Sequence, residues 1–196
     1  MMAQKGVLTT ADYFPIDDFY SFLGILRAEK EYMWELFCYV AFSCQLRCSD
    51  VIARRWADIL GKDTTLITEK KTGKNREIEL NKNVRKRYNE IYQLMGKPDL
   101  QEYIFKSPYT DKPYTIQHIN ARLKEFKFKY KLPVQNFSTH TFRKTFGRMV
   151  YEKSGKSAES LILLNTIFKH SSISVTKAYI GLRKEEISQV YKLIDY

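Results

Sequence analysis

Four residues in the last third of the chain have the side-chain types needed to break and rejoin a phosphodiester bond. His140 and Arg143 stand three positions apart, His170 comes later, and Tyr179 follows His170 by nine residues. A tyrosine that attacks a phosphodiester supplies the nucleophilic oxygen, and cationic groups must stabilise the charge on the phosphate oxygens. The departing alkoxide also needs a proton donor. This order of residue types predicts phosphoryl transfer to tyrosine.

A second group of polar residues lies upstream, where an apolar helical stretch gives way to a polar break. Arg47 and Asp50 follow a run that contains Trp34, Phe37 and Phe42. A guanidinium at the end of a rigid helix can bind two phosphate oxygens with its fork of donors, as a lysine cannot. Alternatively, Arg47 is a C-terminal cation that favours the helix macrodipole. Asp50 either holds Arg47 in place or caps the next helix.

A candidate β-hairpin over residues 64–80 carries lysines at its turn. β-branched residues lie on both sides of Thr72-Gly73-Lys74-Asn75, as in a small antiparallel hairpin. Neighbouring residues on a strand face opposite ways, so Lys70 and Lys71 cannot both reach one phosphate. Lysines near turns are usually solvated. The residues alone leave Lys70, Lys71 and Lys74 as alternatives for a site at the turn.

Taken in order, six positions carry a resemblance to a known family. The chain resembles the catalytic domain of the tyrosine recombinase (phage integrase) family of DNA breaking-rejoining enzymes, over roughly residues 31–196. Residues 45–51, with 55–59 after them, are similar to the family segment that carries its first catalytic arginine, and residues 173–179 are similar to the segment that carries the nucleophile. The six positions are Arg47, Lys71, His140, Arg143, His170 and Tyr179.

The resemblance implies a site-specific DNA recombinase or integrase that cleaves and rejoins DNA through a 3′-phosphotyrosyl bond on Tyr179. Bond energy is conserved in the two transesterifications, so no metal, ATP or other cofactor is implied. Lys71, the better match to the family pattern, would protonate the leaving 5′-oxygen, and Asp50 would support the site. His140 is also a candidate base for the tyrosine proton. Arg47, His140 and Arg143 would bind the phosphate. His170 would bind either the phosphate or the tyrosyl oxygen.

An unperturbed phenol titrates near pH 10, so the cationic pocket is expected to activate Tyr179. Lys144, Arg148 and Lys169 are candidates for contacts to the DNA backbone, and solvated surface charge is the alternative for Lys144 and Arg148. Lys169 also stands where the family usually has a glycine before the histidine. Because glycine permits turns that lysine resists, the backbone before His170 is where this chain departs from the family pattern.

The charge balance favours nucleic acid as the partner. The formal net charge is +11, which attracts polyanions, and we expect double-stranded DNA to bind. A membrane surface is the rival, but no apolar run approaches the ~20 residues of a spanning helix and the first residues lack a signal peptide core. We therefore expect a cytoplasmic, nucleoid-associated protein of a bacterium, phage or mobile element. Cys38, Cys44 and Cys48 lack the spacing of a zinc site and are predicted to be packing thiols.

The predicted fold is mainly α with one small antiparallel β-hairpin, the tyrosine recombinase catalytic-domain fold that the resemblance implies. No linker or repeat divides the chain, so residues 1–196 are expected to form a single catalytic domain, with an N-terminal segment and first helix over residues 1–30. Hydrophobic periodicity predicts helices over residues 16–30, 32–46, 49–55, 83–95, 115–130, 140–152, 158–168 and 184–194.

The last predicted helix carries an apolar stripe of Ile187, Val190, Tyr191 and Ile194. The stripe either packs within its own domain or, as the resemblance implies, docks in trans on a neighbouring protomer. The expected assembly is a homotetramer on synapsed DNA and a monomer in free solution. Most family members carry an N-terminal core-binding domain, for which we find no room before Tyr32. We therefore expect a minimal recombinase or a catalytic fragment, with weak, salt-sensitive DNA binding.

Two other functions use the same features. A type IB topoisomerase shares the chemistry but relaxes supercoils without synapsis. A basic DNA-binding module would bind the duplex and leave the site unused. Replacing Tyr179 with phenylalanine separates these, because DNA binding should survive the change while covalent chemistry is lost.

Overall fold

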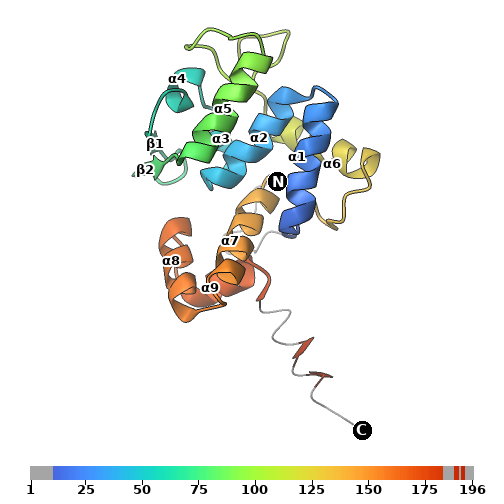
Figure 1. Cartoon of the computed structure of the whole chain (residues 1–196). Helices are drawn as coiled ribbons and strands as arrows, with labels where there is room; N and C mark the ends of the chain where they lie inside the picture. The colour runs from blue at the N-terminus through green and yellow to red at the C-terminus, as the bar shows by residue number, and fades with distance from the viewer. Residues whose placement is uncertain (1–10, 183–187, 190, 193–196) are drawn as a thin grey trace.

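The computed structural model describes residues 11–182, 188–189 and 191–192, which are mostly helical with one two-stranded sheet (Figure 1). This agrees with the predicted fold class. The elements, in chain order, are α1 (Ile16–Ala28), α2 (Tyr32–Ser43), α3 (Cys48–Val51), α4 (Trp56–Ile59), β1 (Thr64–Thr68), β2 (Asn75–Glu79), α5 (Lys82–Leu94), α6 (Ile116–Lys129), α7 (Thr141–Lys153), α8 (Ala158–Phe168) and α9 (Ile173–Tyr179).

Helix α2 lies at the centre of the larger hydrophobic core. Its side chains are buried from Trp34 to Phe42, and it packs against α1, α5 and α7. The buried carboxylate of Glu35 is paired with Arg27 (2.9 Å) and Arg87 (2.8 Å), which meets the requirement that a charge inside a protein has partners. A helix held on several sides is a rigid support for the residues that follow its C-terminus.

The chain leaves α2 at Ser43, earlier than the predicted end at residue 46. Gln45 has a left-handed backbone with φ of 48°, which ends the helix. Its side-chain amide donates to the carbonyl of Ser43 (2.6 Å) and accepts from Nη2 of Arg76 (3.0 Å). The break lets a new helix start at Cys48, with Arg47 as its N-terminal cap residue.

The helix predicted over residues 49–55 is instead two short helices, α3 and α4. The backbone N–H of Arg55 donates to the carboxylate of Asp58 (2.8 Å), which begins α4 separately. Cys38 and Cys44 are buried free thiols and Cys48 is half-buried, in agreement with a packing role.

Strands β1 and β2 form the predicted antiparallel hairpin, with Ile67 opposite Arg76 and Thr65 opposite Ile78. Strand β1 ends at Thr68, so Lys70 and Lys71 both lie in the turn and not on a strand. The prediction that strand alternation would separate these two lysines is therefore wrong.

Helices α7, α8 and α9 enclose a second, smaller core of Leu161, Leu164, Phe168, Tyr179, Ile180 and Leu182. Helix α9 has no predicted range of its own, and the hydroxyl of Ser172 caps its first turn by accepting from the backbone N–H of Val175 (3.3 Å). The helix predicted over residues 184–194, with its trans-docking stripe, falls largely outside the described residues. Within the described part of the chain, no helix is long and apolar enough to span a membrane.

Candidate active site

Four segments bring the predicted site residues to one region: the start of α3, the hairpin turn, the start of α7, and α8 with α9. In Figure 1 the hairpin lies on the same side of the molecule as α8. An ion pair joins the two, with Nζ of Lys169 3.8 Å from Oε1 of Glu69. The charge of Arg47 also acts on His140, Arg143, His170 and Tyr179, so all four lie within its electrostatic reach.

Arg47 projects from the start of α3 and is held by a buried carboxylate. Its Nη1 donates to Oε2 of Glu69 at 2.9 Å, and its side chain remains partly exposed. Its position at an N-terminal cap excludes the alternative of a C-terminal cation on α2. A guanidinium fixed by one carboxylate contact is suited to present its remaining donors to a phosphate.

Asp50 supports the hairpin and not Arg47. Its carboxylate is fully buried, and Oδ1 accepts a hydrogen bond from the backbone N–H of Lys70 at 3.0 Å. The backbone carbonyl of Asp50 accepts from Nε of Arg54 (2.9 Å). Asp50 therefore connects α3 to the turn that carries the candidate lysines.

Lys71 lies in that turn with an exposed side chain. Its positive charge is among the causes that lower the pKa of His140, so it reaches the site electrostatically. This supports Lys71 as the site lysine. The roles of Lys70 and Lys74 remain alternatives, since both are exposed in the same turn.

His140 caps the start of α7 and stands among cations. Desolvation and the charges of Arg143, Lys144, Arg47 and Lys71 lower its pKa to about 4. The residue as a whole is exposed, while burial of the titrating group is the largest cause of the shift and the four neighbouring cations add to it. A neutral imidazole is therefore expected at pH 7.

Arg143 is buried in the first turn of α7, with only 5% of its surface exposed. Its guanidinium carbon lies 5.1 Å from the ring centroid of Phe168, and its buried Nε has no hydrogen-bond partner among the described residues. Burial lowers the pKa of Arg143, and Tyr179 opposes that shift. A buried cation with an unused donor is poised to accept an anion.

His170 and Tyr179 lie against each other, with ring centroids 4.9 Å apart. Nδ1 of His170 is hydrogen-bonded to Oγ1 of Thr176 (3.0 Å), and burial followed by repulsion from Arg143 and Arg47 lowers its pKa to about 4. Tyr179 is 8% exposed, and burial raises its pKa although Arg143 and Arg47 lower it. Burial therefore outweighs the two arginines, and the pKa of Tyr179 lies above its ordinary value.

Lys169 adopts the left-handed conformation that glycine usually provides at a helix end. Its backbone has φ 53° and ψ 46°, and the N–H groups of Lys169 and His170 donate to the carbonyls of Thr166 and Asn165. The departure from the family pattern at this position thus leaves a glycine-like backbone path. Its ammonium points to Glu69, and a contact to DNA remains a prediction.

Lys144 and Arg148 are buried on α7, so the alternative that they are solvated charges is wrong. Nζ of Lys144 donates to the carbonyl of Ala11 and lies 5.2 Å from the ring centroid of Tyr179. Nε of Arg148 donates to Oε1 of Glu152 (2.5 Å). Exposure depends on which tertiary neighbours cover a helix, which the local sequence does not reveal. Their contact to DNA stays a prediction.

Sequence reasoning missed two residues of the region, Glu69 and Arg76. Arg76 shares a strand face with Ile78, so alternation along β2 would have indicated that it faces inward. Burial lowers its pKa, and Glu69 opposes that shift. No sequence signal separated Glu69 from an ordinary hairpin glutamate, because its burial and partners come from distant segments.

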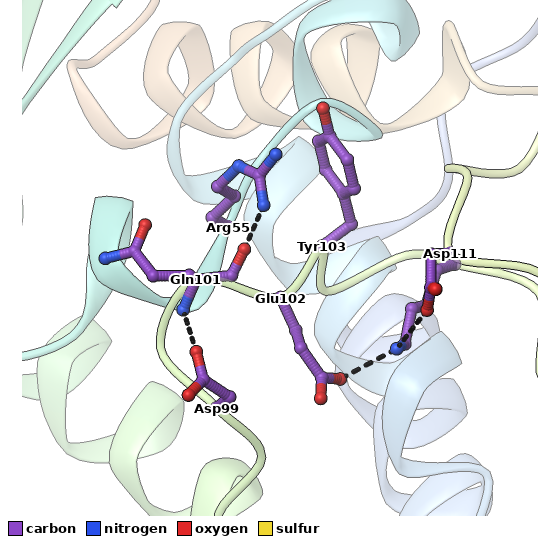
Figure 2. A pocket seen from close by; sticks show the side chains of 7 residues that line it. Arg55, Asp99, Gln101, Glu102, Tyr103 and Asp111 are labelled. Atoms are coloured by element: carbon purple, nitrogen blue, oxygen red, sulfur yellow. Dashed lines mark hydrogen bonds and ion pairs between the residues drawn. The ribbon is translucent and has the colours of Figure 1, made fainter.

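A hollow of about 290 Å³ lies away from these residues, beside α4 and the loop that precedes α6 (Figure 2). Arg55 contacts the carbonyl of Gln101 and stacks over the ring of Tyr103 at 4.0 Å, while Asp99, Glu102 and Asp111 add acidic groups. It contains none of the predicted site residues.

The chain resembles known proteins in sequence over most of its length. The phage integrase family matches residues 16–186. A probable integrase/recombinase, YoeC of Bacillus subtilis (strain 168), is 34% identical over 148 residues, which cover 76% of this chain and 77% of YoeC.

Solved structures share the fold. The XerA recombinase matches with a TM-score of 0.70 at 15% identity, covering 98% of this chain and 68% of XerA. XerH bound to palindromic difH in a post-cleavage complex matches with a TM-score of 0.66 at 15% identity. The match covers 92% of this chain and 53% of XerH, so this chain spans about half the length of XerH. A lambda integrase dimer on a COC′ core site matches with a TM-score of 0.64 at 17% identity, covering 93% of this chain and 63% of the lambda integrase chain. The chain therefore belongs to the phage integrase family of site-specific tyrosine recombinases.

Proposed function

We propose that this chain cleaves and rejoins DNA strands at a specific site through a 3′-phosphotyrosyl intermediate on Tyr179. The observation that carries the proposal is the position of Tyr179, which lies against His170 and within electrostatic reach of Arg47 and Arg143. We further propose that residues 1–196 act as a single catalytic domain.

In the forward step, the Tyr179 oxygen attacks phosphorus, the P–O5′ bond breaks, and a new P–O bond joins the tyrosine to the 3′ side. The phenol proton leaves to a base, and the departing 5′-oxygen takes a proton from Lys71. Arg47 and Arg143 stabilise the added negative charge on the phosphate oxygens. A freed 5′-hydroxyl reverses the step on another strand, so bond energy is conserved.

The lowered pKa values suit both histidines to this chemistry. At pH 7 a group with a pKa of about 4 is neutral, so His140 can accept a proton or a hydrogen bond. A bound phosphate brings negative charge, which raises the pKa of a nearby histidine towards the working pH. His140 is the candidate base for the phenol proton, and His170 orients the tyrosyl or phosphate oxygen.

Double-stranded DNA is the proposed substrate. The net charge of +11 favours a polyanion, and the related XerH and lambda integrase structures were solved with DNA. We propose a homotetramer on two synapsed duplexes and a monomer in free solution, acting in the cytoplasm with the nucleoid. The family match favours a recombinase over a type IB topoisomerase.

A covalent trap tests the proposal. The chain is incubated with a pool of nicked duplexes whose short cleaved end diffuses away, and the denatured mixture is examined for a protein–DNA adduct. We expect an adduct with the wild type and none with Tyr179→Phe, while both bind duplex DNA equally. Duplex binding without any wild-type adduct would instead favour the silent DNA-binding module.

A further inference from the structure

We propose that Glu69 is a positioning residue that fixes three parts of the site relative to one another. The proposal rests on the proposed recombinase function and concerns a side chain to which the family resemblance gives no role. Glu69 lies just after β1, with 3% of its surface exposed. A carboxylate this deeply buried must be paired, and its partners here are residues of the site.

The carboxylate of Glu69 contacts two other segments of the site and a residue of its own turn. Oε2 accepts hydrogen bonds from Nη1 of Arg47 (2.9 Å) and from the hydroxyl of Thr72 (2.8 Å). Oε1 lies 3.8 Å from Nζ of Lys169. The start of α3, the turn that carries Lys71 and the C-terminal cap of α8 thus meet at one side chain.

The backbone of Glu69 also closes the hairpin turn. Its N–H donates to the carbonyl of Lys74 (3.0 Å), and its carbonyl accepts from the N–H groups of Gly73 (2.8 Å) and Thr72 (3.3 Å). Side chain and turn are therefore fixed together. Because Lys71 lies inside this turn, the contact between Glu69 and Arg47 sets the separation of the leaving-group lysine from the phosphate-binding arginine.

The third contact involves Lys169, which stands where the family usually has glycine. Lysine adopts the left-handed region less readily than glycine does, yet Lys169 has this conformation at the end of α8. The ammonium of Lys169, the residue before His170, forms an ion pair with Glu69 in the hairpin turn. A glycine could adopt the same backbone conformation but could not form this ion pair.

Glu69 is also the counter-ion of a cationic cluster. Burial favours its neutral form, but Thr72, Arg47 and Lys169 outweigh burial and lower its pKa, so it is ionised at pH 7. Its charge offsets the mutual repulsion of Arg47, Arg76 and Arg143. Among the described contacts, the ion pair uses Nη1 of Arg47, so Nε and Nη2 remain for a phosphate.

The test compares Glu69→Ala and Glu69→Gln with Glu77→Gln, whose exposed side chain lies on β2 of the same hairpin. All three variants remove one negative charge, so any gain in DNA affinity that comes from the lost charge alone is the same in each of them. Two quantities are measured: affinity for a duplex, and the rate of adduct formation when nicked duplex is saturating. We expect Glu69→Ala to lower the saturating rate by about 10- to 100-fold, the effect of misplacing catalytic groups. We expect Glu69→Gln to fall in between, since it keeps a hydrogen-bond acceptor, with affinity equal to that of Glu77→Gln.

A second measurement tests positioning without chemistry. Amide hydrogen exchange is followed at residues 70–74 and 169–170 in the DNA-free proteins. We expect faster exchange at both segments in Glu69→Ala than in Glu77→Gln, with unchanged exchange in α2. If Glu69→Ala fails to fold, Glu69→Gln carries both measurements.

The outcomes separate this proposal from the function on which it rests. Exchange that is unchanged at both segments overturns the positioning role, whether or not any adduct forms. Faster cleavage and tighter DNA binding than Glu77→Gln would also overturn it, because Glu69 would then be a competitor of the phosphate. A wild type that forms no adduct, with exchange altered as expected, contradicts the proposed function alone.

Discussion

The ring of His170 meets the ring of Tyr179 edge to face, with centroids 4.9 Å apart and planes at 68°. Phe168 completes the cluster at 5.4 Å from Tyr179, and Oγ1 of Thr176 holds Nδ1 of His170. The nucleophile and the second histidine are therefore positioned as one unit by α8 and α9.

Replacing Thr176 with valine should uncouple this unit. The hydroxyl of Thr176 also accepts from Nδ2 of Asn165 (3.1 Å), so valine leaves two polar groups without their partner. We expect a loss of about 1–3 kcal/mol in the free energy of unfolding and a roughly 10-fold slower cleavage, with unchanged DNA affinity. Urea unfolding and single-turnover adduct formation measure these quantities.

Thr166→Val is the matched control, since its hydroxyl bonds the carbonyl of Ile162 on the exposed side of α8. Equal cleavage rates for the two variants would contradict the orienting role of Thr176.

Gly147 allows α7 to approach the nucleophile segment closely. A Cβ atom at this position would lie 2.7 Å from Cγ2 of Ile180 and 2.9 Å from Cε2 of Phe168. We expect Gly147→Ala to cost about 1–3 kcal/mol through overpacking and to slow cleavage, because Phe168 and Ile180 flank His170 and Tyr179.

Gly24→Ala, inside α1 with nothing within 4 Å of the added Cβ, is the control. Alanine should stabilise α1 by about 0.5–1 kcal/mol, because it is the better helix former. Thermal unfolding of both variants gives the comparison, and a Gly147→Ala protein as stable as Gly24→Ala would show that the packing is not tight.

The two site histidines should make the DNA-free protein less stable as the pH falls. Their pKa values are lowered to about 4 in the folded state, against an ordinary value of about 6.5 in the unfolded chain. As pH falls from about 7.5 to 5.5, the unfolded chain binds more protons than the folded one, so stability is lost. Each histidine contributes at most ~1.4 kcal/mol per pH unit, and His140 less because it is exposed.

Urea unfolding at several pH values in this window measures the slope. Most carboxylates titrate below this window, which isolates the histidines. The double variant His140→Gln with His170→Gln should give a shallower slope. Parallel curves for wild type and double variant would contradict the lowered pKa values.

The choice among the turn lysines can be tested by changing the leaving group. A substrate with sulfur in place of the bridging 5′-oxygen departs as a thiolate and needs little protonation. We expect Lys71→Ala to slow cleavage of the oxygen substrate by about 100-fold or more and to cleave the sulfur substrate at a rate near that of wild type. Lys70→Ala and Lys74→Ala should cleave both substrates normally. If the sulfur substrate restored cleavage only in Lys70→Ala or only in Lys74→Ala, that lysine and not Lys71 would be the proton donor to the leaving group.

Most of the fold was predictable because helix periodicity and the Thr72-Gly73 turn are local signals. The elements without a predicted range of their own are short: α4 and α9 have four and seven residues, too few to show a hydrophobic period. The early end of α2 depends on the left-handed Gln45 and its bond to Arg76, a contact between distant segments.

The predicted site residues gather in one region, but their surroundings were not predictable. The sequence around Lys144 and Arg148 is compatible with exposed surface cations. In the structure both side chains are buried, because other segments cover α7. The conformation of Lys169 and the burial of Glu69 are linked to each other across the fold. Such pairings are set by tertiary structure, which no local pattern reports.

Identification of the covalent bond itself tests whether Tyr179 is the nucleophile. The trapped adduct is digested with protease and nuclease, and mass spectrometry locates the residue that carries the nucleotide while end-labelling identifies the released strand end. We predict a 3′-phosphonucleotide on the peptide that contains Tyr179, with a free 5′-hydroxyl on the released strand. An adduct that persists in Tyr179→Phe, maps to another residue, or joins a 5′-phosphate would contradict a 3′-phosphotyrosyl bond on Tyr179.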